Sequence, residues 1–147
     1  MATLGTFTAG QVLTAAELNA IGTWTSYTPT VTQGATVTAT VLYSKYSQIN
    51  DVVHWVYSLV LTSAGTAGQW LQLSLPVSAE AGQRGPGIHQ FFDSNTVTTY
   101  IMTSFFPLAT TMSFVDVNSG ASVFGAAPAV TAANGDLLFG SITYVAA

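Results

Sequence analysis

The chain has 147 residues and no cysteine, which predicts one domain that folds without disulfides or a cysteine-based metal site. Asp, Glu, Lys and Arg make up only 5% of the residues, and hydrophobic residues make up 49% with a mean hydropathy of +0.46. An ordinary soluble domain has roughly 25% charged residues, so a monomer of this chain would have little charged surface to keep it in solution. Three classes of protein have such a composition: a membrane protein, a fibrous low-complexity chain, and a protein whose surface is buried in an oligomer.

The distribution of residues argues against the first two classes. The uncharged stretches 52–79 and 94–115 are interrupted by Thr, Ser, Gln, Gly or Pro, so neither offers the ~20 predominantly apolar residues of a membrane-spanning helix. No collagen-like or heptad period is present. The net charge is −4 and the only basic side chains are Lys45 and Arg84, so the chain lacks the basic face that nucleic-acid binding requires. Burial of the surface in an oligomer is therefore the expected reason for the low content of charged residues.

The first 22 residues differ from the rest. Thr14 and Glu17 fit a capping box, residues 15–20 are good helix formers, and Gly22 can end a helix. This pattern predicts an extended arm and a short helix over residues 14–21. A helix of this length is not stable alone, so it packs either on its own domain or on a neighbouring protein as an anchor. The apolar residues expected to form such an anchor are Phe7, Leu13, Leu18 and Ile21.

Residues 23–147 are rich in Thr, Val, Tyr, Phe and Ile, which favour strands. The clearest strand is 52–62, where alternate residues form one wholly apolar face and one mixed face. The apolar face comprises Val53, Trp55, Tyr57, Leu59 and Leu61, and the mixed face comprises Val52, His54, Val56, Ser58, Val60 and Thr62. This alternation predicts a sheet with one side in the core and the other against water or a partner.

The remaining strands are expected between segments with turn chemistry such as Asn50-Asp51 and Asn134-Gly135-Asp136. Their expected ranges are 24–32, 36–49, 70–75, 87–93, 96–105, 110–117 and 137–145, with a short extra piece at 122–124. About eight short strands at this spacing predict an all-β domain over residues 23–147, an antiparallel β-sandwich with a jelly-roll-like strand order.

The groups that bear chemistry are few and scattered. His54 and His89 fall in separate strands without metal-ligand spacing, and each is best explained as a packed or partner-facing histidine. The carboxylates expected at strand ends, where such residues form turns, are Asp51, Asp93, Asp116 and Asp136. Two such loops could form a calcium site, but no EF-hand spacing is present, nor is a nucleophile elbow or a phosphate-binding glycine loop. We therefore expect no catalytic residue, metal or cofactor, and no enzymatic activity.

Two pairs of adjacent aromatic residues, Phe91-Phe92 and Phe105-Phe106, point to an exposed aromatic surface. Neighbours in a strand face opposite sides, so one member of each pair should leave the core. Exposed aromatic rings either stack on sugars or fill a subunit interface, and the shortage of charge favours the interface. The residues expected at an oligomer interface are His54, Val56, Phe91, Phe92, Phe105 and Phe106.

The opening of the chain, residues 7–19 (FTAGQVLTAAELN) and 22–29 (GTWTSYTP), resembles the start of small virion proteins of tailed phages that infect actinobacteria. Later segments are also similar: 43–46 (YSKY) before a strand, 73–76 (LSLP) closing one, and 134–136 (NGD) before the last. The resemblance covers nearly the whole chain.

This resemblance implies a homotrimeric β-sandwich displayed on the virion and made in the host cytoplasm. Relatives of this type are head decoration proteins, head fibres, minor tail proteins or receptor-binding proteins. The chain has no coiled-coil or collagen-like shaft, which favours a compact decoration (cement) protein bound to the major capsid protein. The alternatives are a minor tail protein or adhesin that contacts tail proteins and, from a third class, a hydrolase of cell-wall polymers.

Overall fold

The computed structural model describes residues 12, 14–15, 21–80, 82–85, 87–118 and 122–147. These residues contain ten strands that form one antiparallel sheet in the order β1-β4-β5-β10-β7-β8-β9-β6-β2-β3. The strands are β1 (Thr25–Ser26), β2 (Val31–Gln33), β3 (Ala35–Val37), β4 (Ala39–Ile49), β5 (Val52–Leu61), β6 (Gln72–Ser74), β7 (Gly87–Asp93), β8 (Thr98–Leu108), β9 (Thr111–Asp116) and β10 (Leu137–Val145). The prediction of an all-β, antiparallel domain is confirmed.

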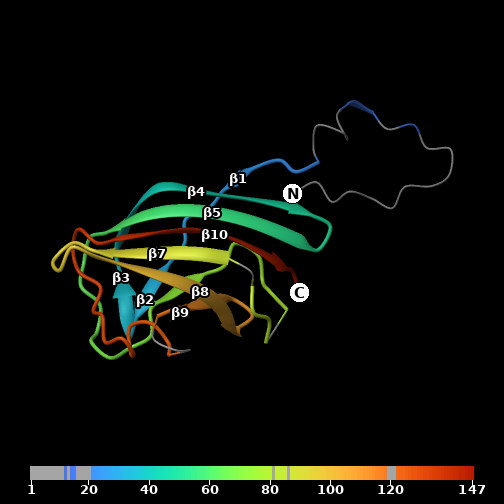
Figure 1. Cartoon of the computed structure of the whole chain (residues 1–147). Coiled ribbons are helices and arrows are strands. Elements are labelled where there is room, and N and C mark those ends of the chain that lie inside the picture. The colour runs from blue at the N-terminus through green and yellow to red at the C-terminus, as the bar shows by residue number, and fades with distance from the viewer. Residues whose placement is uncertain (1–11, 13, 16–20, 81, 86, 119–121) are drawn as a thin grey trace.

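The sheet curls around a single core (Figure 1). Strand β3 lies at one end of the strand order and β4 lies next to the other end, yet only Thr38 separates them along the chain. Thr38 is held at the end of β5, because its carbonyl accepts a hydrogen bond from Thr62 N (2.8 Å) and its N–H donates to Ser63 Oγ (2.9 Å). This crossing brings the two ends of the sheet together over the core.

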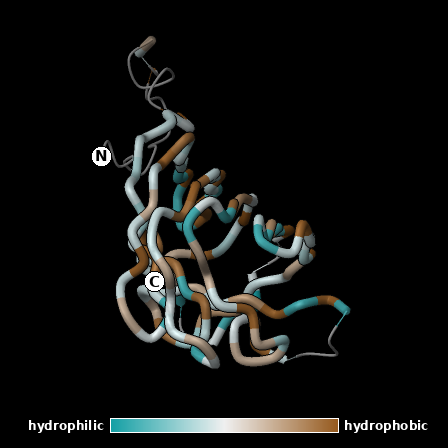
Figure 2. The backbone as a smooth tube through the Cα atoms, turned by 90° about the vertical axis from the view of Figure 1, so that its left-hand side faces the viewer, coloured by the Kyte–Doolittle hydropathy of each residue, from teal (hydrophilic) through white to brown (hydrophobic). Residues whose placement is uncertain are grey.

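The core is built mainly from the inward-facing side chains, which alternate with outward-facing ones along the strands. On β5 the predicted apolar face is buried throughout. The adjacent strand β10 contributes Leu138 and Ile142 from the same side, and β7, on the far side of β10, contributes Phe91. The facing half of the sheet adds Leu73, Met112 and Phe114. Apolar and polar segments are accordingly interleaved along the coloured, described part of the backbone (Figure 2), as expected where strand neighbours point to opposite faces.

Two predicted strands are interrupted. The expected strand 24–32 breaks into β1 and β2 around Pro29, whose missing N–H cannot join a ladder, and the expected strand 36–49 breaks at Thr38. Strand β8 runs on to Leu108 through Pro107, and the register of its pairing with β9 shifts there. The expected piece at 122–124 is reduced to an isolated bridge between Val123 and Val115.

The predicted helix over residues 14–21 and the anchor residues Phe7, Leu13 and Leu18 lie largely outside the described residues. Ile21, the remaining anchor residue, is exposed, and the chain after it runs along β4 as β1. Within the described part of the chain, no helix is long and apolar enough to cross a membrane.

Candidate functional site

The outward-facing side chains of β5, β10 and β7 form a continuous surface that carries no Asp, Glu, Lys or Arg. Its registers are fixed by pairing: Val56 lies opposite Ser141, which lies opposite Ile88, and Val60 lies opposite Leu137, which lies opposite Phe92. We call this surface the outer apolar face, and it consists of Val52, Val56, Val60, Ile88, Phe92, Leu137 and Phe139, with His54, Ser58, Gln90, Ser141 and Thr143 between them.

The face is open to solvent in the single chain. Ile88 is 66% exposed and Val52 is 47% exposed, and Ile101 on β8, opposite Gln90, extends the surface with 47% exposure. A shallow depression of about 390 Å³ lies in its middle, between Val56, Ile88 and Phe139. Exposed apolar side chains gathered on one sheet face make it the candidate interaction surface of the chain.

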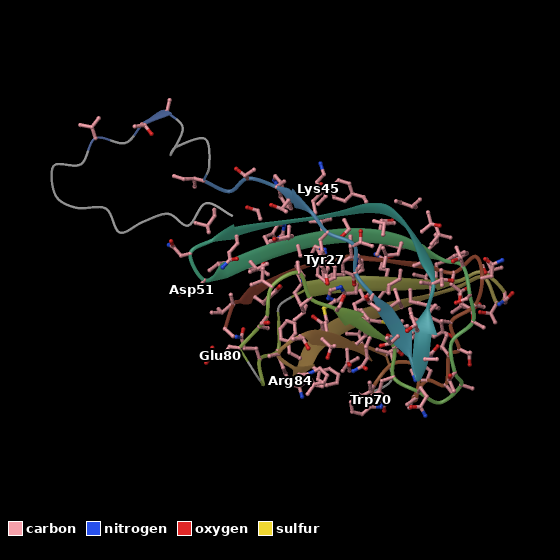
Figure 3. All side chains as sticks on the ribbon, turned by 180° about the vertical axis from the view of Figure 1, so that it is seen from behind. Tyr27, Lys45, Asp51, Trp70, Glu80 and Arg84 are labelled. Atoms are coloured by element: carbon pink, nitrogen blue, oxygen red, sulfur yellow. The ribbon has the colours of Figure 1, made fainter. Side chains whose placement is uncertain are left out.

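Charge is confined to the flank of this face. Lys45 on β4 lies opposite Val56 in the β4–β5 ladder, with its Nζ 5.8 Å from the centre of the Tyr43 ring. The labelled charged residues Asp51, Glu80 and Arg84 lie toward one end of the domain (Figure 3). The outer apolar face therefore offers a partner hydrophobic contact and hydroxyl or amide groups, without charges to desolvate.

The structure divides the six predicted interface residues into three groups. His54, Val56 and Phe92 lie on the outer apolar face, where a partner could contact them. Phe91 and Phe106 do not, because both are core residues with at most 2% exposure, so their assignment to an interface is wrong. Phe105 is partly exposed, but it lies beyond the end of β7, opposite Ser113 of β9, and its ring contacts Trp70. It belongs to a different part of the surface.

The two histidines do not share a site. His54 is exposed on the outer apolar face, where its Nδ1 lies 2.9 Å from Thr143 Oγ1 and its ring forms a T-shaped pair with the Trp24 ring. His89 points to the opposite side of the sheet and is fully buried, and this burial lowers its pKa to about 4. Residues on opposite faces of one sheet cannot act together on a ligand.

Three of the four predicted strand-end carboxylates bind nearby amides. Asp93 Oδ1 accepts from Asn95 N (2.9 Å) and Thr96 N (3.1 Å), and Asp116 Oδ1 accepts from Asn118 N (3.3 Å).

The buried Asp136 links two turns. Its Oδ1 accepts from both the N–H and the hydroxyl of Ser94, and its Oδ2 accepts from Ala133 N. Among the described residues, no three His, Asp or Glu side chains gather where they could hold a metal ion.

Sequence reasoning missed part of the outer apolar face, namely Ile88, Leu137 and Phe139. The alternation that marked Val56 was present in these strands too, since the buried Leu138 and Phe91 alternate with them. What the sequence could not supply was the strand order, in which β10 inserts between β5 and β7 and joins three outer faces into one.

Comparisons with known proteins give no relative from which a function could be carried over. No family model matches the chain, and neither a curated protein nor a solved structure matches it at a significant level.

Proposed function

We propose that this chain is a non-enzymatic structural protein of a phage particle that assembles through its outer apolar face. The observation that carries the proposal is a surface spanning three strands without one Asp, Glu, Lys or Arg. The occupant we propose for this face is a second copy of the chain, because an uncharged surface associates with its own kind without like-charge repulsion.

The assembly we propose is a homotrimer. Each subunit is a compact, sandwich-like unit in which two halves of the curled sheet enclose the core, and three such units meet around a threefold axis. Cyclic symmetry closes the assembly, so the apolar faces of all three subunits are buried and no open chain of subunits forms. The resemblance of the opening segment to phage virion proteins supports the same arrangement.

The place that we propose for the trimer is the outside of the capsid, as a decoration protein that clamps neighbouring copies of the major capsid protein. The alternative is a minor tail protein or a receptor-binding adhesin of the tail, built from the same trimer. The compact described domain, which has no shaft among its described residues, favours the capsid.

Copy number distinguishes the two locations. Quantitative mass spectrometry of purified virions is expected to give a copy number comparable with that of the major capsid protein. A copy number that is a small fraction of it would favour the tail, and an antibody against the chain would then be expected to block adsorption.

Attachment to the particle is assigned in this proposal to residues 1–22. The described chain enters the domain at the β1–β4 edge, where Gly22 lies against Ile49 and Ser47. Deleting residues 1–22 is expected to leave a folded trimer that no longer joins the particle. A truncated chain that fails to fold would show instead that this segment packs on its own domain.

A hydrolase acting on cell-wall polymers has weaker support. Such an enzyme needs a carboxylate pair or a histidine and a nucleophile held together. In the described ranges the carboxylates of Asp93, Asp116 and Asp136 bind turn amides, and the two histidines lie on opposite faces of the sheet.

A further inference from the structure

A second surface, separate from the outer apolar face, surrounds the exposed indole of Trp70. It is a groove of about 450 Å³ lined by Thr32, Gly34, Thr36, Gln69, Trp70 and Gln72. Figure 3 places Trp70 on the opposite side of the domain from Lys45, which flanks the outer apolar face. An assembly through that face would therefore leave the groove open.

The floor of the groove is fixed by strand pairing. Thr36 lies opposite Thr32 in the β2–β3 hairpin, and Thr32 lies opposite Gln72 of β6, so the three side chains form one outward-facing row. Leu71 and Leu73 are fully buried, and the alternation between them turns Trp70 and Gln72 outward. Gln72 is held in place by its Nε2, which donates to Ser113 Oγ (3.0 Å).

Trp70 forms a wall that is both exposed and positioned. Trp70 is 44% exposed, and its ring forms a T-shaped pair with the Phe105 ring, with ring centres 6.1 Å apart. The next residue, Leu71, donates its N–H to Phe124 O (3.1 Å), which ties the backbone beside the indole to the 122–124 segment. A large apolar ring held in this way offers a ligand its flat surface at little entropic cost.

The polar groups of the groove are neutral and available. Within the described part of the chain, the side chains of Thr32, Thr36 and Gln69 make no hydrogen bond. Hydroxyl and amide groups both donate and accept, so they suit a ligand that does the same. None of the lining residues is charged, so nothing in the groove would select a phosphate or a carboxylate.

We propose that this groove binds a neutral oligosaccharide. A sugar ring has an apolar C–H face that can lie on the Trp70 indole and a rim of hydroxyls that can pair with the threonine and glutamine side chains. Ligand sites generally combine such an aromatic surface with a few convergent polar groups. This proposal does not rest on the location in a capsid or a tail.

The test uses the full chain and four neutral probes: cellohexaose, maltohexaose, mannohexaose and arabinohexaose. Tryptophan fluorescence is measured in a Trp24→Phe background, because Trp55 is buried and Trp70 is then the remaining exposed indole. Isothermal titration calorimetry of the unmodified chain provides the affinity. At least one probe is expected to bind saturably with a Kd below about 1 mM.

Substitutions show where on the chain the oligosaccharide binds. Trp70→Ala is expected to weaken it by about tenfold or more, and Thr36→Ala, at an exposed hairpin position, is expected to weaken it by a smaller factor. Phe92→Ala removes an aromatic ring from the outer apolar face and is expected to leave the affinity unchanged. Circular dichroism and the melting temperature report whether each variant is folded.

Three results would overturn the proposal. The first is that none of the four probes binds. The second is that the probes bind Trp70→Ala, or Thr36→Ala if Trp70→Ala does not fold, as tightly as they bind the parent chain. The third is that hexagalacturonate, a charged sugar chain, binds more tightly than every neutral probe.

Discussion

The Tyr57 hydroxyl and His89 Nδ1 lie 2.7 Å apart, although a whole strand separates the strands that carry them. The residue between them in the register is Gly140 of β10, and its lack of a side chain lets the two rings meet. A Cβ at Gly140 would lie 2.5 Å from His89 Nδ1. The contact is buried, and among the described residues His89 Nε2 has no hydrogen-bond partner.

The free energy of unfolding is expected to decrease as the pH is lowered, because of His89. Burial lowers the pKa of His89 from 6.5 to about 4, so the folded state binds fewer protons than the unfolded state between these values. The stabilisation is therefore complete above pH 6.5 and is lost as the pH falls to 4, by about 3 kcal/mol. Urea denaturation at a series of pH values measures this loss.

A matched pair of variants isolates the effect. His89→Phe is expected to flatten the dependence between pH 6.5 and 4, whereas His54→Gln, at an exposed position, is expected to keep it. An unchanged slope in His89→Phe would show that other groups cause the loss.

Gly140 is expected to tolerate no side chain. In Gly140→Ala the new methyl group would meet His89 and the Ile88 carbonyl, 2.7 Å away, so the histidine or the strand must shift. We expect a loss of about 2–4 kcal/mol in the free energy of unfolding, typical of overpacking in a rigid core. Gly68→Ala is the control, because a Cβ there meets nothing within 4 Å. Its cost is expected to be about 1 kcal/mol, from the positive φ alone.

Gln33 is expected to be a major determinant of stability although it is polar. Its buried amide donates from Nε2 to Val130 O (2.7 Å) and Gln69 O (3.1 Å), and its Oε1 accepts from Ala132 N (2.8 Å). Gln33→Leu leaves these backbone groups unpaired and is expected to cost about 3 kcal/mol. Gln90→Leu makes the same change on the outer sheet face and is expected to cost less than about 0.5 kcal/mol. Equal costs in the two variants would contradict the role assigned to Gln33.

Asp136 is expected to act through its hydrogen bonds rather than as a ligand. In Asp136→Asn one carboxylate oxygen is replaced by an NH2 group, which cannot accept a hydrogen bond. In one orientation of the asparagine amide this group faces the Ala133 N–H, and in the other it faces the Ser94 N–H. One backbone donor therefore loses its acceptor in either case. We expect a loss of about 2 kcal/mol in chemical denaturation. Asp51→Asn, at the exposed tip of the β4–β5 hairpin, is the control and is expected to be neutral. A metal-dependent melting temperature in the parent chain that disappears in Asp136→Asn would point to a metal site instead.

Strand positions and the inward or outward direction of side chains could largely be predicted from the sequence, because both depend on local alternation. Trp55 and Tyr57 are buried and Val56 faces outward for that reason. The phenylalanine pairs show the limit: alternation predicts that one ring of each pair is buried, but which one depends on the register with neighbouring strands. The insertion of β10 beside β5, the crossing at Thr38 and the groove beside Trp70 arise from contacts between distant segments, which no local pattern encodes.

The most direct test of assembly through the outer apolar face is the molar mass in solution. Sedimentation equilibrium of the parent chain at micromolar concentration is expected to give a trimer. Phe139→Lys, which places a charge in the middle of the face, is expected to give a folded monomer, because burying three unpaired charges around an axis costs several kcal/mol. Thr36→Lys, with the same charge on the Trp70 side, is expected to remain a trimer. A monomeric parent chain, or a trimer that persists unchanged in Phe139→Lys, would contradict the account.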